Sequence, residues 1–290
     1  MFATYQLQEL IDQALKEDIG SGDLSTRILP EDLTGLAKLY AKQEGVIAGL
    51  SLVEQVFQRV DPRIRVHRLA KDGDVVKVGG VVLELVGSLS SILQGERTAL
   101  NFLQHLSGIA TATKRAVDLV SGLSVSIVDT RKTLPGWRNL QKYAVRVGGG
   151  QNHRFGLYDA VMLKDNHLAA VGGLTVAVER IKAQVGHMTK IEVECETIEQ
   201  VKEAVTCGVD VIMLDNMGLA EMREAVQYID KRAIVEASGG MKEERLRDVA
   251  ETGVDLISIG ALTNSVTALD FSLDLGEIKA TTRASWERGI

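Results

Sequence analysis

The stretch "KIEVECETIEQVKEAVTCGVDVIMLDNM", residues 190–217, begins and ends with a short strand-like run. The two runs are "KIEVE" and "DVIMLD", and the segment between them has the amphipathic spacing of a helix. Parallel strands need a crossover connection of this kind, so the stretch predicts two neighbouring parallel strands joined by a helix. Each strand ends in a carboxylate, Glu194 or Asp215.

The same alternation extends over the chain from residue 124 onward. Strand-like runs recur as "VSIVD", "AVMLK", "AIVEA" and "DLISIG", which makes about six in all. The later strands end near residues 194, 215, 238 and 260, so the repeats are 21, 23 and 22 residues long. Polar residues end every strand, which favours a βα barrel, whereas a doubly wound open sheet would concentrate them near one switch point. We therefore predict an α/β protein with an incomplete βα barrel over residues 113–268, and keep the doubly wound sheet as the alternative.

A small α+β domain is predicted before the barrel, over residues 1–112. Its residues 36–86 read mainly as short strands separated by turns. Helical spacing is found in residues 5–17, 50–60 and 90–120. The last of these helices would link the domain to the barrel, and the tail, residues 269–290, begins with an alternating run that we expect to pack on the small domain.

Composition excludes several classes of protein. The 45% hydrophobic and 25% charged residues are ordinary for a globular chain, and the net charge of −6, without a Lys/Arg block, argues against nucleic acid as a partner. The sequence has no run of 18 apolar residues and no secretory leader, so neither a membrane span nor export is expected. The only two cysteines, Cys195 and Cys207, suit a reducing compartment, and we predict a cytoplasmic protein.

Cationic residues meet at the predicted carboxyl ends of the first strands. "VDTRKT", residues 128–133, places Arg131 and Lys132 after the first strand, and Lys164 ends the second. Between these strands, "GGGQNHR" brings His153 and Arg154 to the same rim. A cationic group inside an acidic protein predicts a ligand with several negative charges, such as carboxylates or phosphates.

The strand-end carboxylates indicate a metal. Glu194 and Asp215 would repel a polyanion unless a divalent cation lay between, which favours Mg²⁺ with a pyrophosphate-bearing substrate. "SGG" at 238–240 and "IGAL" at 259–262 close the last two strands, where barrels often bind phosphate through backbone N–H groups. Structural explanations exist for each feature, including an ion-pair layer with Glu192, but they leave the coincidence of all these residues at one rim unexplained. Cys195 would face the helices, so we expect no thiol nucleophile.

At these residues the chain resembles the quinolinate phosphoribosyltransferases, the type II phosphoribosyltransferase family. The resemblance runs through "EDIGSGDLST", "GERTALNFLQHLSGIAT", "DTRKTLPGWRNLQKYAVRVGGGQNHRFGLYDAVMLKDNH", "EVECET", "IMLDNM", "EASGG" and "GVDLISIGALTNS", in the order of the family. It implies the reaction of quinolinate with phosphoribosyl pyrophosphate in NAD biosynthesis, giving nicotinate mononucleotide, pyrophosphate and CO₂, with Mg²⁺ required.

The resemblance also implies roles for individual residues. The pyridine carboxylates would be held by Arg97, Arg131, His153, Arg154 and Lys164. Phosphoribosyl pyrophosphate and its metal would be served by Lys132, Glu194 and Asp215, the two carboxylates contacting Mg²⁺ directly or through water. The implied catalytic group is Lys132, Lys164, Glu194 and Asp215. Further substrate contacts would come from Thr130, Ser238, Gly239, Gly240, Ile259, Gly260 and Ala261, those from 238 onward at the 5'-phosphate.

The resemblance further implies a homodimer, or a higher oligomer, with shared active sites. Arg97 lies well before the first barrel strand, so it would complete the site of a partner subunit. Three other functions stay open: a paralogous phosphoribosyltransferase associated with molybdenum transport, a Schiff-base aldolase using Lys164, and a carrier module. The carrier interpretation rests on "KDGDVVKVGGVVLELVG", which resembles half of a biotinyl or lipoyl domain but lacks the characteristic Met-Lys-Met turn.

Overall fold

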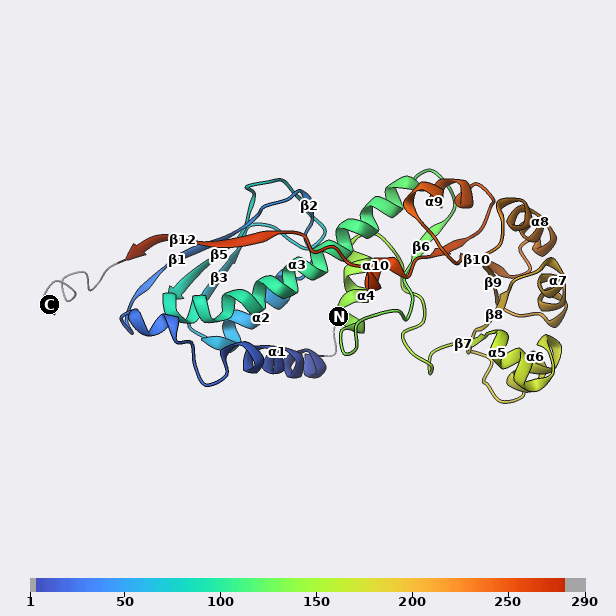
Figure 1. Cartoon of the computed structure of the whole chain (residues 1–290), viewed down its shortest axis with the longest axis horizontal. Coiled ribbons are helices and arrows are strands. Elements are labelled where there is room, and N and C mark those ends of the chain that lie inside the picture. Colours follow the sequence, from blue (N-terminus) through green and yellow to red (C-terminus); the bar gives the residue numbers. More distant parts are fainter. Residues whose placement is uncertain (1–3, 280–290) are drawn as a thin grey trace, which may run out of the picture. The chain divides into compact units, whose positions relative to one another are not determined.

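The computed structural model describes residues 4–279 and divides into two compact units (Figure 1). Unit 1 contains residues 4–112, 139–148 and 266–279, and unit 2 contains Thr113–Arg138 and Gly149–Ser265. The domain limits drawn from the sequence remain a prediction, and residues 280–290 of the predicted tail lie outside the described residues. Within residues 4–279, none of the helices combines the length with the apolar character that crossing a bilayer requires.

Unit 1 is built on an antiparallel sheet of four strands in the order β12-β1-β5-β3. These strands are β1 (Thr34–Ala41), β3 (Arg65–Arg68), β5 (Val81–Ser88) and β12 (Phe271–Lys279). A small second pair consists of β2 (Gly45–Val46) and β4 (Val75–Val76). Along β1 the side chains of Ala37, Leu39 and Ala41 are buried and alternate with more exposed ones, as expected for a strand with one face on a core.

The helices of unit 1 follow the periodicity of the sequence. They are α1 (Thr4–Ile19), the short 3₁₀ helix η1 (Ser25–Ile28), α2 (Leu50–Val60), the first part of α3 (Leu89–Leu119) and most of α4 (Arg138–Val147). The helices predicted over 5–17, 50–60 and 90–120 are thereby confirmed. α2 begins where the carboxylate of Asp72 accepts the backbone N–H groups of Gly49 and Leu50, at 2.9 and 3.0 Å. An anion at a helix N-terminus is favourable because the first N–H groups have no partner within the helix.

Unit 2 is a parallel sheet of six strands in the order β6-β11-β10-β9-β8-β7. The strands are β6 (Ser126–Val128), β7 (Val161–Leu163), β8 (Ile191–Cys195), β9 (Val211–Asp215), β10 (Ile234–Ser238) and β11 (Leu256–Ser258). All six coincide with the strands predicted from the sequence. From β7 to β11, chain neighbours are sheet neighbours, and β6 then lies beside β11. This is the cyclic order of a barrel, open at a seam between β6 and β7, and it rules out the doubly wound alternative.

The helices of unit 2 lie along the outer side of its sheet (Figure 1). They are α5 (Asp165–Val171), α6 (Leu174–Lys182), α7 (Ile198–Cys207), α8 (Leu219–Ile229) and α9 (Glu243–Ala250), whereas the single turn α10 (Ala261–Asn264) contributes Ala261 and Asn264 to the lining of a cavity. α7 shows how the sequence sets their limits: Thr197 and Gln200 form a capping box at its start, and Gly208 ends it with a φ of +63°.

Alternation along the strands separates the helix-covered core from the interior of the barrel. Val193 and Cys195 on β8 are fully buried, whereas Glu194 between them lines a cavity. Ile212 and Leu214 are buried on β9 in the same way, with Met213 on the cavity side. The interior of the barrel therefore carries the polar residues that the helices do not cover.

Candidate active site

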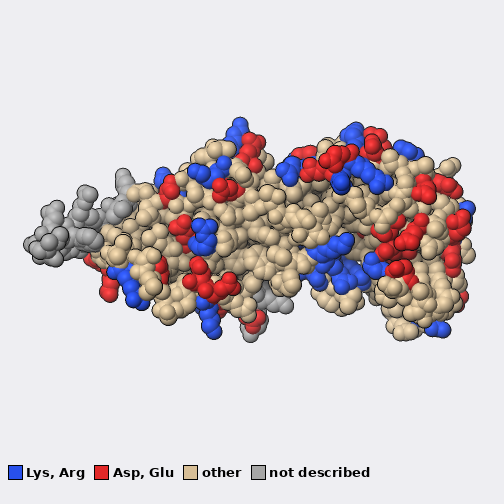
Figure 2. Space-filling model, in the orientation of Figure 1, with Lys and Arg blue, Asp and Glu red and all other residues tan. Residues whose placement is uncertain are grey.

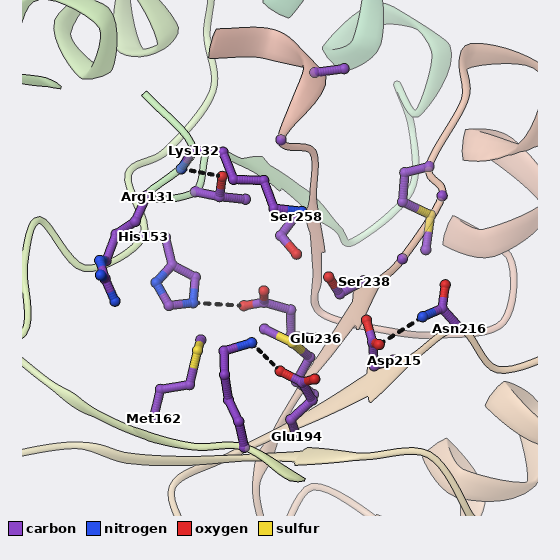
Figure 3. A pocket seen from close by; sticks show the side chains of 18 of the residues that line it. Arg131, Lys132, His153, Met162, Glu194, Asp215, Asn216, Glu236, Ser238 and Ser258 are labelled. Carbon is purple, nitrogen blue, oxygen red and sulfur yellow. Dashed lines mark hydrogen bonds and ion pairs between the residues drawn. The ribbon is translucent and has the colours of Figure 1, made fainter. Parts of the chain in front are cut away.

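A cavity of about 830 Å³ lies at the carboxyl ends of the strands of unit 2 (Figure 3). The predicted site residues among its lining are Thr130, Arg131, Lys132, His153, Arg154, Lys164, Glu194, Asp215, Ser238, Gly239, Gly240, Gly260 and Ala261. Ile259 is absent from the lining because its side chain is buried in the core, 6% exposed. Arg97 lies on α3 in unit 1 and is not part of this cavity wall.

The first strand end presents two exposed cations, Arg131 and Lys132. Their backbone is fixed: Thr130 Oγ1 accepts the N–H of Lys132 at 3.0 Å, and Thr263 Oγ1 donates to the carbonyl of Lys132 at 2.8 Å. The stem of Lys132 also passes close to Gly260, where an added Cβ would lie 2.9 Å from Lys132 Cδ. Among the described residues, neither cationic group forms an ion pair. Both are therefore available to an anionic ligand.

The ends of the next three strands, β7, β8 and β9, carry charged side chains that are hydrogen-bonded. Lys164 donates to the carboxylate of Glu194, and Asn216 Nδ2 donates to Asp215 Oδ2 at 2.7 Å. Asn216 has a φ of 55°, a conformation that Asn tolerates better than most residues. Figure 2 shows basic side chains gathered beside acidic ones in this part of the molecule. The two carboxylates and the Asn216 amide are hard oxygen donors, the kind that Mg²⁺ prefers, so the residues present fit this ion.

The loop that follows β10 presents backbone groups to the cavity at two glycines, which have no side chains. Gly239 and Gly240 both have positive φ, 89° and 55°. A Cβ added at Gly239 would lie 2.2 Å from Asn216 Oδ1, so glycine is required there for the close approach of the two loops. Lys242 and Asn264 also line this side of the cavity and were missed by sequence reasoning, because both lie a few residues beyond a strand end.

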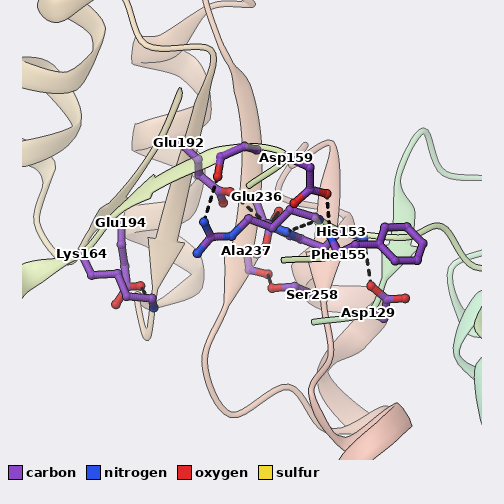
Figure 4. Close-up of polar contacts among 12 residues, drawn as sticks. Asp129, His153, Phe155, Asp159, Lys164, Glu192, Glu194, Glu236, Ala237 and Ser258 are labelled. Carbon is purple, nitrogen blue, oxygen red and sulfur yellow. Dashed lines mark hydrogen bonds and ion pairs between the residues drawn. The ribbon is translucent and has the colours of Figure 1, made fainter. Parts of the chain in front are cut away.

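A buried polar cluster lies at the floor of the cavity (Figure 4). His153 Nε2 is 3.1 Å from Glu192 Oε2 and 3.5 Å from Glu236 Oε2, and the two carboxylates are buried. Glu236 was not predicted as a site residue, and Glu192 was considered only for a structural layer. The signal for Glu236 was available: it stands in the apolar strand "AIVEA" on the same face as Ser238.

The protonation of this cluster is set by competing effects. Burial alone would lower the pKa of His153, but hydrogen bonds to Glu192 and Glu236 and their charges raise it to about 10. The backbone N–H of Arg154 points at Nδ1 from 2.7 Å, which instead favours a neutral ring. Whether the His153 ring is protonated or neutral, its Nε2 carries a proton, because Nε2 faces carboxylate oxygens. Burial also raises the pKa of Glu192, against the opposing hydrogen bond from His153.

The loop that carries His153 and Arg154 is held by buried and half-buried polar contacts. Asp129, fully buried, accepts the N–H of His153 at 2.9 Å and Asn152 Nδ2 at 2.5 Å. Arg154 Nη1 donates to the carbonyl of Ala160 at 2.9 Å. Burial lowers the pKa of Arg154, and the charge of Arg131 acts in the same direction. Two guanidinium groups near each other favour an anion between them.

A thiol nucleophile is absent from this cavity. Cys195 is fully buried on the helix side of β8, and burial raises the pKa of its thiol to about 12. This confirms the expected orientation of Cys195, toward the helices and away from the cavity.

Comparisons with known proteins agree with this geometry. Residues 23–107 match the N-terminal domain of quinolinate phosphoribosyl transferase, and residues 109–274 match its C-terminal domain. A probable nicotinate-nucleotide pyrophosphorylase [carboxylating] of Bacillus subtilis is 45% identical, covering 93% of each chain. A protein of the same description from Methanocaldococcus jannaschii is 41% identical and covers 95% of this chain and 99% of its own.

Solved structures give the same result. The crystal structure of NadC from Streptococcus pyogenes superposes with a TM-score of 0.92 at 41% identity, covering 96% of this chain and 99% of that one. The nicotinate-nucleotide pyrophosphorylase from Francisella tularensis has a TM-score of 0.92 at 36% identity, covering 95% and 98%. Both domain models match in order, and together with these identities they show that the chain belongs to the quinolinate phosphoribosyltransferase family.

Proposed function

We propose that the protein transfers the phosphoribosyl group of phosphoribosyl pyrophosphate to quinolinate, with decarboxylation. The products are nicotinate mononucleotide, pyrophosphate and CO₂, and the reaction belongs to NAD biosynthesis. The observation that carries the proposal is the cavity of unit 2, where Arg131 and Lys132, which form no ion pair with any described residue, share the wall with the strand-end carboxylates of Glu194 and Asp215. Family membership supports it, since relatives more than 40% identical are named for this carboxylating pyrophosphorylase.

Quinolinate has two adjacent carboxylates, and the cationic side of the cavity suits them. Arg131 is exposed and Arg154 half-buried, so one guanidinium reaches into the cavity and the other forms part of its wall. His153 and Lys164 add positive charge nearby. Planar guanidinium groups bind carboxylates through two parallel hydrogen bonds, which fixes the pyridine ring as well as holding it.

The opposite side of the cavity suits phosphoribosyl pyrophosphate. Lys132, Glu194 and Asp215 would hold its pyrophosphate and an Mg²⁺ ion, which neutralises charge on the leaving group when bound. Ser238, Gly239 and Gly240 would hold the 5'-phosphate through backbone N–H groups. Glu194, on the phosphoribosyl pyrophosphate side, forms an ion pair with Lys164, on the quinolinate side. The two substrate sites therefore share this ion pair.

The reaction requires that the two substrates are oriented and that developing charge is stabilised. It needs no covalent intermediate with the enzyme. The pyridine nitrogen forms a bond to the ribosyl C1 as the bond from C1 to pyrophosphate breaks, through a transition state with oxocarbenium character. The cavity residues hold the two reacting atoms in line and offset charge as it develops. When the neighbouring carboxylate then departs as CO₂, its bonding electron pair stays on the ring carbon, where the positive charge of the quaternised nitrogen stabilises it until a proton from water takes the place of the carboxylate.

The oligomeric state and the compartment are also part of the proposal. We infer a homodimer in which Arg97 of each chain contributes to the carboxylate site of its partner, as the resemblance implies. Two free cysteines, one of them buried, are consistent with the cytoplasm.

One assay tests the reaction. The protein is mixed with phosphoribosyl pyrophosphate, Mg²⁺ and either quinolinate or nicotinate, and nicotinate mononucleotide and CO₂ are measured. Quinolinate should react and nicotinate should not. The several cations of the cavity can pair with the two carboxylates of quinolinate, whereas nicotinate has only one and would leave cations without a partner. Equal turnover of nicotinate would contradict the proposal. Borohydride trapping of a substrate on Lys164 would favour the aldolase, and no reaction with either pyridine would favour the paralogous transferase.

A further inference from the structure

The seam of the sheet in unit 2 leaves one part of the cavity wall without strand pairing. β6 and β7 are the two edges of the sheet, and the loop of residues 149–160 runs between α4 and β7. The loop is tied to β6 by the β-bridge between Val128 and Gln151 and by the hydrogen bond from Gln151 Nε2 to Ser126 Oγ, at 2.9 Å. Asp129, directly after β6, also accepts the backbone N–H of His153, so the backbone of the loop is fixed from the β6 side, whereas the ring of His153 reaches side chains of other strands.

Two carboxylates from the strands on either side of β9 contact this ring. Glu192 comes from β8 and Glu236 from β10, and both reach His153 Nε2. Their side chains are 6% and 1% exposed. The second oxygen of each, Oε1, has no hydrogen-bond donor among the described residues, nor does Arg154 Nε have an acceptor. The carboxylates are therefore not committed to holding another part of the core.

Packing alone does not account for these carboxylates. On β9, which lies between β8 and β10, Met213 stands beside Glu236 in the register and also lines the cavity. An apolar side chain is thus accommodated in the same layer, and burying carboxylates is costly unless they are paired. They also lie beneath a cavity that has to bind an anion, which their charge would repel.

We propose that Glu192 and Glu236 are positioning residues that orient His153, and through it Arg154, toward the carboxylates of the pyridine substrate. This rests on the function proposed above. His153 faces the two carboxylates with Nε2 and accepts the backbone N–H of Arg154 at Nδ1, at 2.7 Å, so one chain of contacts runs from both carboxylates through the ring to Arg154. The carboxylates act through His153 and need no contact with the substrate.

Conservative substitutions separate this role from simple electrostatics. Glu192→Gln and Glu236→Gln remove a negative charge below the anion site but keep the side-chain length. If charge alone mattered, quinolinate would bind more tightly to them. Orientation predicts the opposite, with affinity weaker by roughly tenfold to a hundredfold, the usual effect of losing a charge-assisted hydrogen bond. Glu236→Asp keeps the charge but withdraws the oxygen from the ring, so its quinolinate affinity should fall at least as far.

The experiment measures quinolinate binding to the free full-length protein by calorimetry, and the KM for each substrate by steady-state kinetics. The KM for phosphoribosyl pyrophosphate should stay within about twofold, since its contacts lie on the other side of the cavity. Glu224→Gln, on the exposed face of α8, is the matched control and should change neither value. Unchanged or tighter quinolinate binding by the Gln variants would overturn the proposal.

A spectroscopic measurement keeps the outcomes apart. In protein labelled with ¹⁵N-histidine, the Nε2–H signal of His153, assigned with His153→Asn, should shift in both Gln variants. An unshifted signal would overturn the positioning role even if a variant were too unstable for kinetics. If the wild type bound no quinolinate while these shifts occurred, the proposed function would fail and the contact between Glu192, Glu236 and His153 would stand.

Discussion

Arg131 and Arg154 both line the cavity, but they differ in exposure. Removing a guanidinium that pairs with a substrate carboxylate leaves that charge unpaired, at a cost of roughly 2 to 5 kcal/mol. Arg131→Ala and Arg154→Ala should therefore abolish detectable quinolinate binding in calorimetry. Arg180→Ala, at an exposed position on α6, is the control and should bind normally. Retained binding by both cavity variants would place the carboxylate site elsewhere.

Substitution of Glu194 or Asp215 should impair the use of phosphoribosyl pyrophosphate rather than the binding of quinolinate. If both contact the Mg²⁺-pyrophosphate unit, Glu194→Ala and Asp215→Ala should impair the use of phosphoribosyl pyrophosphate, while quinolinate binding to the free protein largely survives. Kinetics with varied phosphoribosyl pyrophosphate, together with calorimetry of quinolinate, measure the two effects. The assignment would be reversed if Asp215→Ala lost quinolinate affinity with unchanged phosphoribosyl pyrophosphate kinetics.

The protonation of His153 predicts a pH dependence of stability. Its pKa is raised from 6.5 to about 10 in the folded protein, so the folded state binds the ring proton more tightly than the unfolded state. The resulting stabilisation is full below about pH 6.5 and is lost as the pH rises through about 10. Urea unfolding across this range should show a steeper fall in the free energy of unfolding for the wild type than for His153→Asn. Parallel profiles would indicate the neutral ring that the Arg154 N–H contact favours.

The sequence predicted the site best where a residue stands at a strand end. Arg131, Lys164 and Asp215 could be found because parallel strands bring their carboxyl ends to one rim. Ile259 also follows a strand, but the preceding Ser258 lines the cavity and the side chain of Ile259 is buried, so its predicted contact with the 5'-phosphate stays a prediction about the backbone. Glu236 was missed because a charge within a strand has no partner in the sequence itself; its partner, His153, comes from a distant loop.

At the scale of the elements, the close approach of the loops after β9 and β10 gives a stability prediction. Gly239→Ala would place a Cβ 2.2 Å from Asn216 Oδ1 at a φ of +89°. It should lower the free energy of unfolding by about 1 to 3 kcal/mol, as is usual for strained backbone, and impair phosphoribosyl pyrophosphate binding. Gly240→Ala is the matched control: its φ is +55°, but no atom lies within 4 Å of an added Cβ. An equal decrease in the free energy of unfolding for the two variants would show that the contact with Asn216 does not contribute to the destabilisation.

The strands and long helices were predictable because their periodicity is local. All six strands of unit 2 and the three helices predicted in the first part of the chain are present. The seam was not predictable in position, since it depends on which strands pair, and pairing joins residues far apart in sequence. The placement of β6 beside β11 is such a long-range contact.

At the scale of the whole molecule, shared active sites predict complementation between inactive subunits. Arg97→Ala and Lys132→Ala proteins are each expected to be inactive, the first in the carboxylate site and the second in the pyrophosphate site. After subunit exchange, a heterodimer should regain one intact site, and activity should return when the two are mixed. No activity despite demonstrated exchange would argue against sharing, as would a fully active monomer.

The pairing of β12 with β1 has a consequence for biosynthesis. β1 is made early, but β12, which covers its free edge, follows the whole of unit 2 in the chain. While the ribosome translates unit 2, β1 is an edge strand with unpaired backbone groups, the kind of surface that recruits other strands. Unit 2 can complete its parallel sheet before β12 is synthesised. The part of the nascent chain that is made first is therefore the part most prone to misassembly. A chaperone that shields strand edges should raise the yield of folded protein more than faster translation would.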